Sequence, residues 1–385
     1  MKKKNIILLL NAFWNNGKGM SGGDQMMIQI FKRIRKEFGF VCCVTNVDGK
    51  KYIEKDVDDF EYYVSLRFFD KLWLPLNYIF RTIYASGIVF RKNIDVIHVG
   101  SDFFPDVIPA YLYKILHPKT RWIQCIFHIY PDWKKRPGNK MRNFFAQYCQ
   151  RFSFQLSRRA DKIININYQI KDGLIQLGLS EARFVVNTPG INVEYFQNLK
   201  VKEDTKKYDA TFLARLNPSK GIFDLIDIWK KVVEKNPSAQ LAIMGGGSKE
   251  VNEKMRQKIN KAELGKNIDL LGFLENDESF SIIKNSRVFL FPSHEEGFGI
   301  AVAEAMACGV PVISWNLPVY QEIFENFSVQ LAENNLELFS QEVVDMLRDN
   351  DRRKKIADEA GGFIKKYDWN SIALNHLRIL QENVE

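Results

Sequence analysis

The sequence is poor in the features that mark secreted, zinc-binding and membrane-spanning proteins. Its 385 residues include five cysteines, an odd number, and none of them forms a Cys-x-x-Cys pair. Neither a disulfide framework nor a zinc site is indicated, and a reducing cytoplasm is the expected compartment. No apolar run reaches the ~18 residues that a membrane-spanning helix needs. Repeats of short period and low-complexity segments are also absent.

The first residues imitate a signal peptide without completing one. Lysines at positions 2–4 precede a short apolar run over residues 6–10. That run is too short for a signal peptide, and it ends at Asn11 with no small-residue cleavage site. A buried first strand is therefore the expected structure.

Composition and length indicate a globular protein of two domains. Hydrophobic residues make up 46% of the chain and charged residues 26%, as in soluble proteins. A chain of 385 residues is long for one core and suits two domains.

Predicted strands and helices alternate in both halves of the chain. The first half begins with a strand at residues 5–10, a glycine-rich loop at residues 15–23 and a helix at residues 24–38. Further strands are predicted at residues 41–45, 94–99, 122–127, 162–167 and 183–187. A polar stretch over residues 198–207 indicates a linker. Strands then resume at residues 208–213, 240–244, 268–271, 288–291 and 310–314. This pattern predicts two doubly wound domains with parallel sheets, whose ligands bind beyond the carboxyl ends of the strands, in a cleft between the domains. The aromatic-rich residues 52–90 predict no clear elements.

The most informative segment spans residues 292–311. A short apolar strand leads into the turn Glu296-Gly297-Phe298-Gly299, and a small-residue helix follows to about residue 308. Gly309 and Pro311 end that helix. The free N–H groups and positive dipole end at its start favour an anion.

Two carboxylates flank this helix start. Glu296 lies in the turn, and Glu304 lies little more than one turn inside the helix. An anion site beside two carboxylates suits a ligand with phosphates and hydroxyls. A nucleotide-sugar is such a ligand.

Three more loops follow predicted strands of the second half. In the first loop, Arg215 and Lys220 can clamp a diphosphate, although either alone is more often a surface cation. The triple glycine at residues 245–247 lacks the spacing of a dinucleotide-binding fingerprint. Backbone groups of Gly272 and Phe273 either read a base or form a plain strand-to-helix turn.

At these residues the chain resembles the retaining glycosyltransferases of family 4, which have the GT-B fold. The resemblance covers nearly the whole chain, and besides Glu296 and Glu304 it rests on residues 160–164, 188–196 and 215–221. Gly22 and Gly23 are similar to the family's N-terminal glycine loop. Residues 367–369 are similar to its crossover to a last helix, here about residues 371–381.

The resemblance implies roles by position on the donor side. Glu304 is similar to the glutamate that holds the donor ribose. Glu296 is similar to the one that contacts the donor sugar, with backbone N–H groups of Phe298, Gly299 and Ile300 nearby.

It also implies roles for three basic residues. Arg215 and Lys220 resemble the pair that neutralises the leaving diphosphate. His128 resembles a histidine that contacts the transferred sugar; without the resemblance it would more often be a core histidine.

Three positions depart from the family pattern. Ala214 stands where a glycine usually precedes the arginine, Ile129 where an aspartate is frequent, and Gln25 where a glutamate is common. None of these changes removes a group expected to carry charge in the reaction. The changes at Ile129 and Gln25 concern the details of sugar and acceptor binding.

The expected activity is that of a retaining, metal-independent hexosyltransferase. The resemblance implies transfer from a nucleoside-diphosphate sugar to a hydroxyl of a glycan or lipid-linked acceptor, in cell-surface polysaccharide synthesis. No Asp-x-Asp motif occupies a convincing loop, so we expect no metal, and no cofactor besides the nucleotide-sugar substrate. Residues 1–197 are the expected acceptor domain, with a helix at 371–385 packing back on it, and residues 198–370 the donor domain.

The surplus of positive charge, +9 over the whole chain, gathers in residues 134–159. Aromatic residues interleave with the lysines and arginines of this segment. It is interpreted either as a helix that lies on an anionic membrane surface or as an ordinary amphipathic helix with a solvated basic face. No nucleic-acid-binding motif accompanies the charge, so nucleic acid is not an expected partner. The expected location is the cytoplasm, on the inner membrane face.

Rival functions remain open at this point. A non-catalytic GT-B protein that binds or scaffolds is the main alternative, and the intact charged residues speak against it. A nicotinamide-dependent oxidoreductase is not favoured by the triple-glycine loop. A sugar phosphorylase or starch-type synthase is longer than this chain.

Overall fold

The computed structural model describes residues 3–12, 22–130, 132–134, 140–325, 327–331 and 334–382, except for the side chain of Arg142. The chain divides into two compact units, one made of Met1–Gly190 with Trp369–Glu385 and the other of Ile191–Asp368. We predicted a domain boundary after residue 197, whereas the first unit ends at Gly190. The polar stretch over residues 198–207 therefore lies inside the second unit.

The first unit is built on a seven-stranded parallel sheet with the order β3-β2-β1-β4-β5-β6-β7. Its strands are β1 (Asn5–Leu10), β2 (Phe40–Thr45), β3 (Glu61–Val64), β4 (Val96–Val99), β5 (Arg121–Cys125), β6 (Lys162–Asn165) and β7 (Phe184–Val186). All were predicted except β3, which lies in the aromatic-rich stretch. In β1 the five residues after Asn5 are all buried, as expected for a strand covered on both faces.

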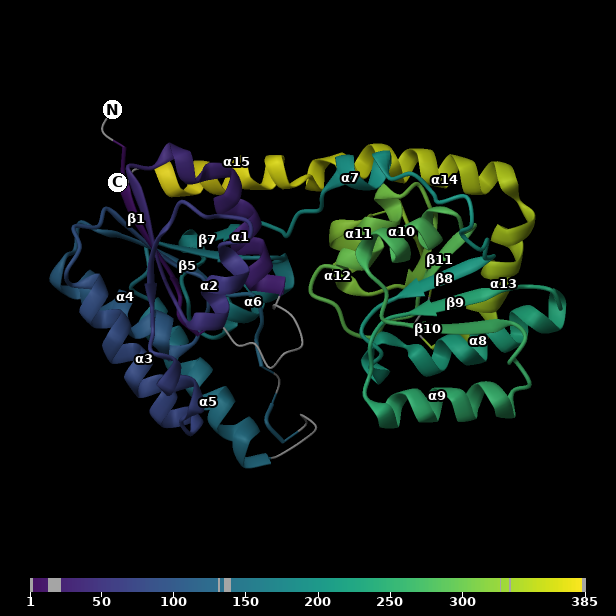
Figure 1. The fold of residues 1–385 in the computed structure, drawn as a ribbon, viewed down its shortest axis with the longest axis horizontal. Helices are drawn as coiled ribbons and strands as arrows, with labels where there is room; N and C mark the ends of the chain where they lie inside the picture. The colour runs from purple at the N-terminus through teal and green to yellow at the C-terminus, as the bar shows by residue number, and fades with distance from the viewer. Residues whose placement is uncertain are drawn as a thin grey trace. The chain divides into compact units, whose positions relative to one another are not determined.

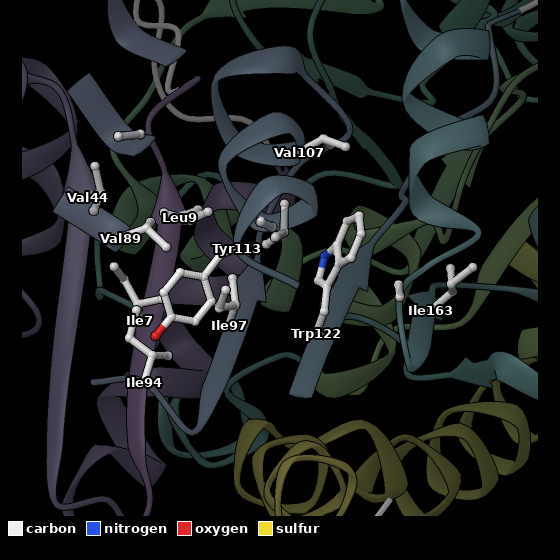
Figure 2. Packing of buried hydrophobic residues seen from close by; sticks show 14 of the residues in the cluster. Ile7, Leu9, Val44, Val89, Ile94, Ile97, Val107, Tyr113, Trp122 and Ile163 are labelled. Carbon is white, nitrogen blue, oxygen red and sulfur yellow. The ribbon is translucent and has the colours of Figure 1, made fainter. Parts of the chain in front are cut away.

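Seven α-helices are described in this unit, on the two faces of the sheet (Figure 1). They are α1 (Gly22–Ile34), α2 (Val47–Ile53), α3 (Leu74–Val89), α4 (Phe104–Leu116), α5 (Lys140–Ser157), α6 (Tyr168–Gln176) and α15 (Trp369–Gln381). Figure 2 shows how Val89 of α3 and Tyr113 of α4 pack over Ile7, Ile97 and neighbouring strand residues. Of the glycine-rich loop predicted over residues 15–23, residues 15–21 lie outside the described residues, and Gly22 and Gly23 begin α1 instead.

The last helix, α15, is fastened to the first sheet by a buried histidine pair. His376 Nε2 lies 2.8 Å from His98 Nε2, and His376 Nδ1 lies 3.1 Å from the side-chain nitrogen of Asn187. Burial lowers the pKa of His376 to about 3, so both rings are neutral at pH 7 and one can donate to the other.

The second unit has a six-stranded parallel sheet with the order β10-β9-β8-β11-β12-β13. Its strands are β8 (Ala210–Leu213), β9 (Leu241–Met244), β10 (Ile268–Gly272), β11 (Val288–Phe291), β12 (Val312–Trp315) and β13 (Val329–Leu331). Its helices are α7 (Val193–Asn198), α8 (Ile222–Lys235), α9 (Lys249–Lys261), α10 (Asn276–Lys284), α11 (Ile300–Ala307), α12 (Pro318–Ile323), α13 (Leu336–Arg348) and α14 (Asn350–Phe363). Both units are doubly wound, as predicted; only β13 was missed among the strands of the second.

Candidate donor site

Two loops meet at the carboxyl edge of the second sheet. One follows β8 and the other follows β11, and these strands are paired neighbours. Gly221 makes the approach possible: its φ is +69°, and a Cβ there would lie 1.7 Å from the carbonyl oxygen of Pro292. The His294 N–H also donates to the Ser219 carbonyl at 2.9 Å. Glycine is therefore required where the loops touch.

Where the two loops meet, the side chains of Lys220 and Glu296 form an ion pair. Lys220 Nζ lies 2.7 Å from Glu296 Oε1 and 2.9 Å from the carbonyl oxygen of Glu295. The Ser293 hydroxyl donates to the same carboxylate oxygen at 3.1 Å. Only 19% of the Lys220 side chain and 12% of the Glu296 side chain are exposed. An ammonium has three N–H donors, and these contacts use two, so the third is available to a phosphate oxygen.

The N-terminus of α11 (Ile300) lies four positions after Glu296 in the chain. Gly299 caps this helix with φ +90° and contributes no side-chain hydrogen bond. The first N–H groups of the helix, beginning with Ile300, therefore have no side-chain cap and suit an anion. The Phe298 ring is buried against Phe324 and Tyr367, so only its backbone can face a ligand.

Glu304 lies on α11, one turn inside the helix. Its carboxyl makes no hydrogen bond to any other part of the chain that the structure describes. Although the residue is partly accessible to solvent, the protein around it desolvates the carboxyl and raises its pKa to about 8. Its charge in turn helps to raise the pKa of Tyr195 and Cys308, which lie near it. A carboxyl held without a partner is suited to the hydroxyls of a ligand.

Three further predicted residues lie at the same sheet edge, and none of them forms a hydrogen bond or ion pair with Lys220 or Glu296 in the described structure. Arg215 follows β8, is exposed, and forms no ion pair within the described ranges. Gly272 ends β10 with φ +73°, and the ring of Phe273 beside it is 74% exposed. The structure thus joins Lys220 to Glu296 and places the other three residues after strands of the same sheet edge.

The triple-glycine loop has a structural explanation. Gly245 has φ +134°, and a Cβ there would lie 1.7 Å from the carbonyl oxygen of Ala214. The Leu216 N–H donates to the Gly246 carbonyl at 2.8 Å. These glycines allow two neighbouring loops to pack backbone to backbone, and this packing explains why glycine occupies these positions.

In the first unit, His128 is positioned by a residue that sequence reasoning missed. Gln150 of α5 donates to the His128 carbonyl at 2.9 Å and to Asp102 Oδ2 at 2.6 Å, and accepts from the Tyr130 N–H at 2.8 Å. The His128 ring is exposed and meets the Tyr130 ring edge to face. Gln150 is buried, so one amide fixes the loops after β4 and β5.

The glycine pair of the first unit lies at the start of α1. A Cβ on Gly23 would lie 2.5 Å from the ring of Phe127, whereas Gly22 faces open space. Gly23 thus allows α1 to pack closely against the strand end that carries His128. A direct contact of either glycine with a donor stays a prediction.

Other contacts at the donor site also gave little sequence signal. His294 Nε2 lies 2.9 Å from Asp224 Oδ2, which ties the loop after β11 to α8. The Tyr320 hydroxyl is buried without a partner among the described residues, and its ring lies beneath Gly299. Within those residues no cluster of three or more His, Cys, Asp or Glu is arranged to hold a metal ion.

Two doubly wound units of this kind constitute the GT-B fold, and solved structures share it. Anabaena Alr3699/HepE, solved with UDP and glucose, matches over 98% of this chain and 99% of its own, with a TM-score of 0.74 and 17% identity. A glycosyltransferase from Rickettsia africae matches over 99% of this chain and 98% of its own, with a TM-score of 0.77 and 16% identity.

Comparison of the sequence with known proteins finds relatives among glycosyltransferases. Residues 196–362 match the model for glycosyl transferases group 1. An uncharacterized glycosyltransferase of Methanocaldococcus jannaschii is 27% identical over 225 residues, or 58% of this chain and 60% of that protein. The poly(glycerol-phosphate) alpha-glucosyltransferase of Bacillus subtilis is 25% identical over 278 residues, or 71% of this chain and 40% of that protein. The chain therefore spans less than two thirds of these relatives.

Proposed function

We propose that this protein is a retaining glycosyltransferase that moves a hexose from a nucleoside-diphosphate sugar to an acceptor hydroxyl. The observation that carries the proposal is the Lys220–Glu296 contact beside the uncapped N-terminus of α11. It sets a cation, a carboxylate and free N–H groups at one edge of the sheet. Those groups match the diphosphate and the sugar hydroxyls of such a donor.

The reaction breaks the bond between the anomeric carbon and a diphosphate oxygen and forms a bond to the acceptor oxygen on the same face. The acceptor hydroxyl gives up its proton to the leaving diphosphate. Negative charge grows on the leaving diphosphate. Lys220, Arg215 and the first N–H groups of α11 are the groups we assign to that charge, and they act without a metal ion or cofactor. Glu304 would hold the ribose hydroxyls, and His128 would contact the transferred sugar.

For the acceptor, we propose a glycan or lipid-linked molecule of cell-surface polysaccharide synthesis. The names of two relatives support this class. One is the poly(glycerol-phosphate) alpha-glucosyltransferase given above. The other is the putative colanic acid biosynthesis glycosyltransferase WcaL of Escherichia coli, 28% identical over 166 residues, which are 42% of this chain and 40% of that protein.

We place the enzyme in the cytoplasm, on the inner membrane face. In the described parts of the chain, no helix combines the length and the apolar character needed to cross a membrane. The basic, aromatic-rich residues 134–159 support attachment to an anionic surface instead, and α5 is the described helix within them.

The test is hydrolysis of candidate donors by the purified protein without acceptor. Uridine-diphosphate sugars come first in the panel, followed by other nucleoside-diphosphate sugars. Slow release of the nucleoside diphosphate from one donor supports the proposal. Binding without any turnover, even with acceptor extracts, would favour the non-catalytic scaffold. With an α-linked donor, proton NMR of the product must show an α linkage, since a β linkage contradicts retention.

A further inference from the structure

Three neighbouring helices of the first unit expose large apolar side chains. On α3 these are Leu76, Ile79 and Ile83, at helical spacing on one side. The opposite side of α3 carries the buried residues Ala85 and Ile88. The helix is therefore apolar on its exposed, outer side as well as on its buried, inner side.

The outer apolar stripe continues on α4 and α5. Leu112, Ile115 and Leu116 are exposed in the last turns of α4. Met141, Phe145, Tyr148 and Phe152 are exposed along one side of α5. Figure 1 shows α3, α4 and α5 lying side by side in the first unit, and α4 packs against both of its neighbours. We call this set of exposed side chains, with Trp73, the apolar face.

The residue before α3, Trp73, is the most exposed member of the apolar face. Trp73 is 74% exposed at the residue before α3. Phe68 is exposed in the short helix η2 (Arg67–Lys71) that precedes it. So many exposed apolar side chains on adjoining helices are typical of a surface that contacts another protein or a membrane.

The charge around the apolar face is one-sided. Residues 74–89 contain no acidic side chain, and their one cation, Arg81, is buried and paired with Asp70. Arg67 and Lys71 are exposed beside Phe68 and Trp73, and Lys119 follows the end of α4. These three cations form no ion pair with any residue that the structure describes. The rim is therefore basic.

We infer that the apolar face docks into the headgroup and acyl boundary of an anionic lipid membrane. The cations at its rim would contact anionic headgroups, and Trp73 would lie at the polar boundary that indoles favour. A second copy of this chain is a poor partner, because two basic rims would repel each other. The surface proposed above for membrane attachment, on α5, thereby extends over α4 and α3, and this inference rests on that attachment.

The experiment is vesicle co-sedimentation of the full chain with phosphatidylglycerol–phosphatidylcholine vesicles and with pure phosphatidylcholine vesicles. The test variant is Ile79→Glu with Ile83→Glu. The matched control is Leu338→Glu with Leu374→Glu, at exposed leucines outside the apolar face. We expect the test variant to lower the partition coefficient by about tenfold or more, since it removes two inserted side chains and adds negative charge. The control should bind like the wild type, and melting temperatures should confirm that both fold.

Salt and fluorescence separate the possible outcomes. High salt should weaken wild-type binding without abolishing it, and brominated lipids should quench Trp73, as judged against Trp73→Phe. Equal binding of test variant and control would overturn the inference while leaving membrane attachment in place. If the wild type does not bind vesicles, both this inference and the proposed membrane attachment are overturned. A dimer in solution that Ile79→Glu with Ile83→Glu dissociates, without vesicle binding, would make a second copy the partner and also overturn it. The assay needs no nucleotide, so its failure leaves the proposed reaction untouched.

Discussion

Lys220 and Glu296 lie 76 positions apart in the chain, and their side chains meet at 2.7 Å. The contact fixes a cation at the sheet edge where α11 begins. Because both side chains are mostly buried, the pair is more ordered than an exposed ion pair. We infer that it holds the ammonium in place before a diphosphate arrives, which spares reorganisation during the reaction.

Replacing either proposed phosphate-binding cation should reduce turnover strongly. We expect Lys220→Ala and Arg215→Ala each to lower kcat by about 10²-fold or more, the scale of losing one charge-stabilising donor. Lys230→Ala, at an exposed lysine of α8, is the matched control and should retain activity. Steady-state kinetics with the identified donor provide the measurement. Near-normal turnover of both variants would remove the two cations from the proposed mechanism.

The close approach of the two donor-site loops should depend on Gly221. An alanine there would be strained at φ +69° and would collide with the Pro292 carbonyl. We expect Gly221→Ala to lower the free energy of unfolding by about 3 kcal/mol or more.

Gly362→Ala is its control. This glycine lies in α14 with open space around it, and alanine there should stabilise the protein by about 0.5–1 kcal/mol. Urea unfolding measures both variants. An unfolding free energy unchanged by Gly221→Ala would contradict the account of this junction.

Glu304 should make stability fall as pH rises. Its pKa in the folded protein is about 8, above the ordinary 4.5, so the folded state binds this proton more tightly than the unfolded chain does. Between those pH values the group's contribution to stability is therefore lost as pH rises. Glu304→Gln cannot ionise, so its stability relative to the wild type should increase from pH 5 to pH 8 by roughly 1–3 kcal/mol.

Urea unfolding at the two pH values measures this difference. Glu359→Gln, at an exposed glutamate of α14, should show no such increase. Glu304→Gln should also weaken nucleotide binding, because an amide replaces the carboxyl group that we propose accepts hydrogen bonds from the ribose hydroxyls. A stability difference independent of pH would mean that Glu304 is not desolvated.

Gln150 should affect transfer while leaving nucleotide binding intact. Gln150→Ala removes the amide that joins Asp102 to the His128–Tyr130 loop. We expect a fall in kcat of about tenfold or more from misplacement of His128. The Kd for the nucleoside diphosphate should be unchanged, since the proposed phosphate-binding groups belong to the second unit. Gln155→Ala, at an exposed glutamine of α5, is the control. A variant that retains full kcat would show that His128 needs no such support.

The elements around Glu296 were predictable because their signals are local. An apolar strand, a glycine turn and a small-residue helix ending in Gly309 all act within a few residues, and β11 and α11 lie where they were predicted. The contact of Glu296 with Lys220 is not local. It follows from the pairing of β8 with β11, which no pattern in the sequence specifies.

The apolar face escaped prediction for a different reason. Helix periodicity is visible only when one side of a helix is polar. In α3 the outer residues Leu76, Ile79 and Ile83 are as apolar as the inner ones, so the stretch had no readable period. Gln150 was missed because a single buried glutamine has no spacing that marks it.

We propose above all that the second unit binds a nucleoside diphosphate through Lys220 and the start of α11. The most direct measurement is the melting temperature of the wild type and of Lys220→Ala across a panel of nucleoside diphosphates and their sugars. We expect at least one ligand to raise the melting temperature of the wild type by several degrees, and Lys220→Ala to lose most of this rise. No rise with any ligand, or an equal rise in both proteins, would contradict it.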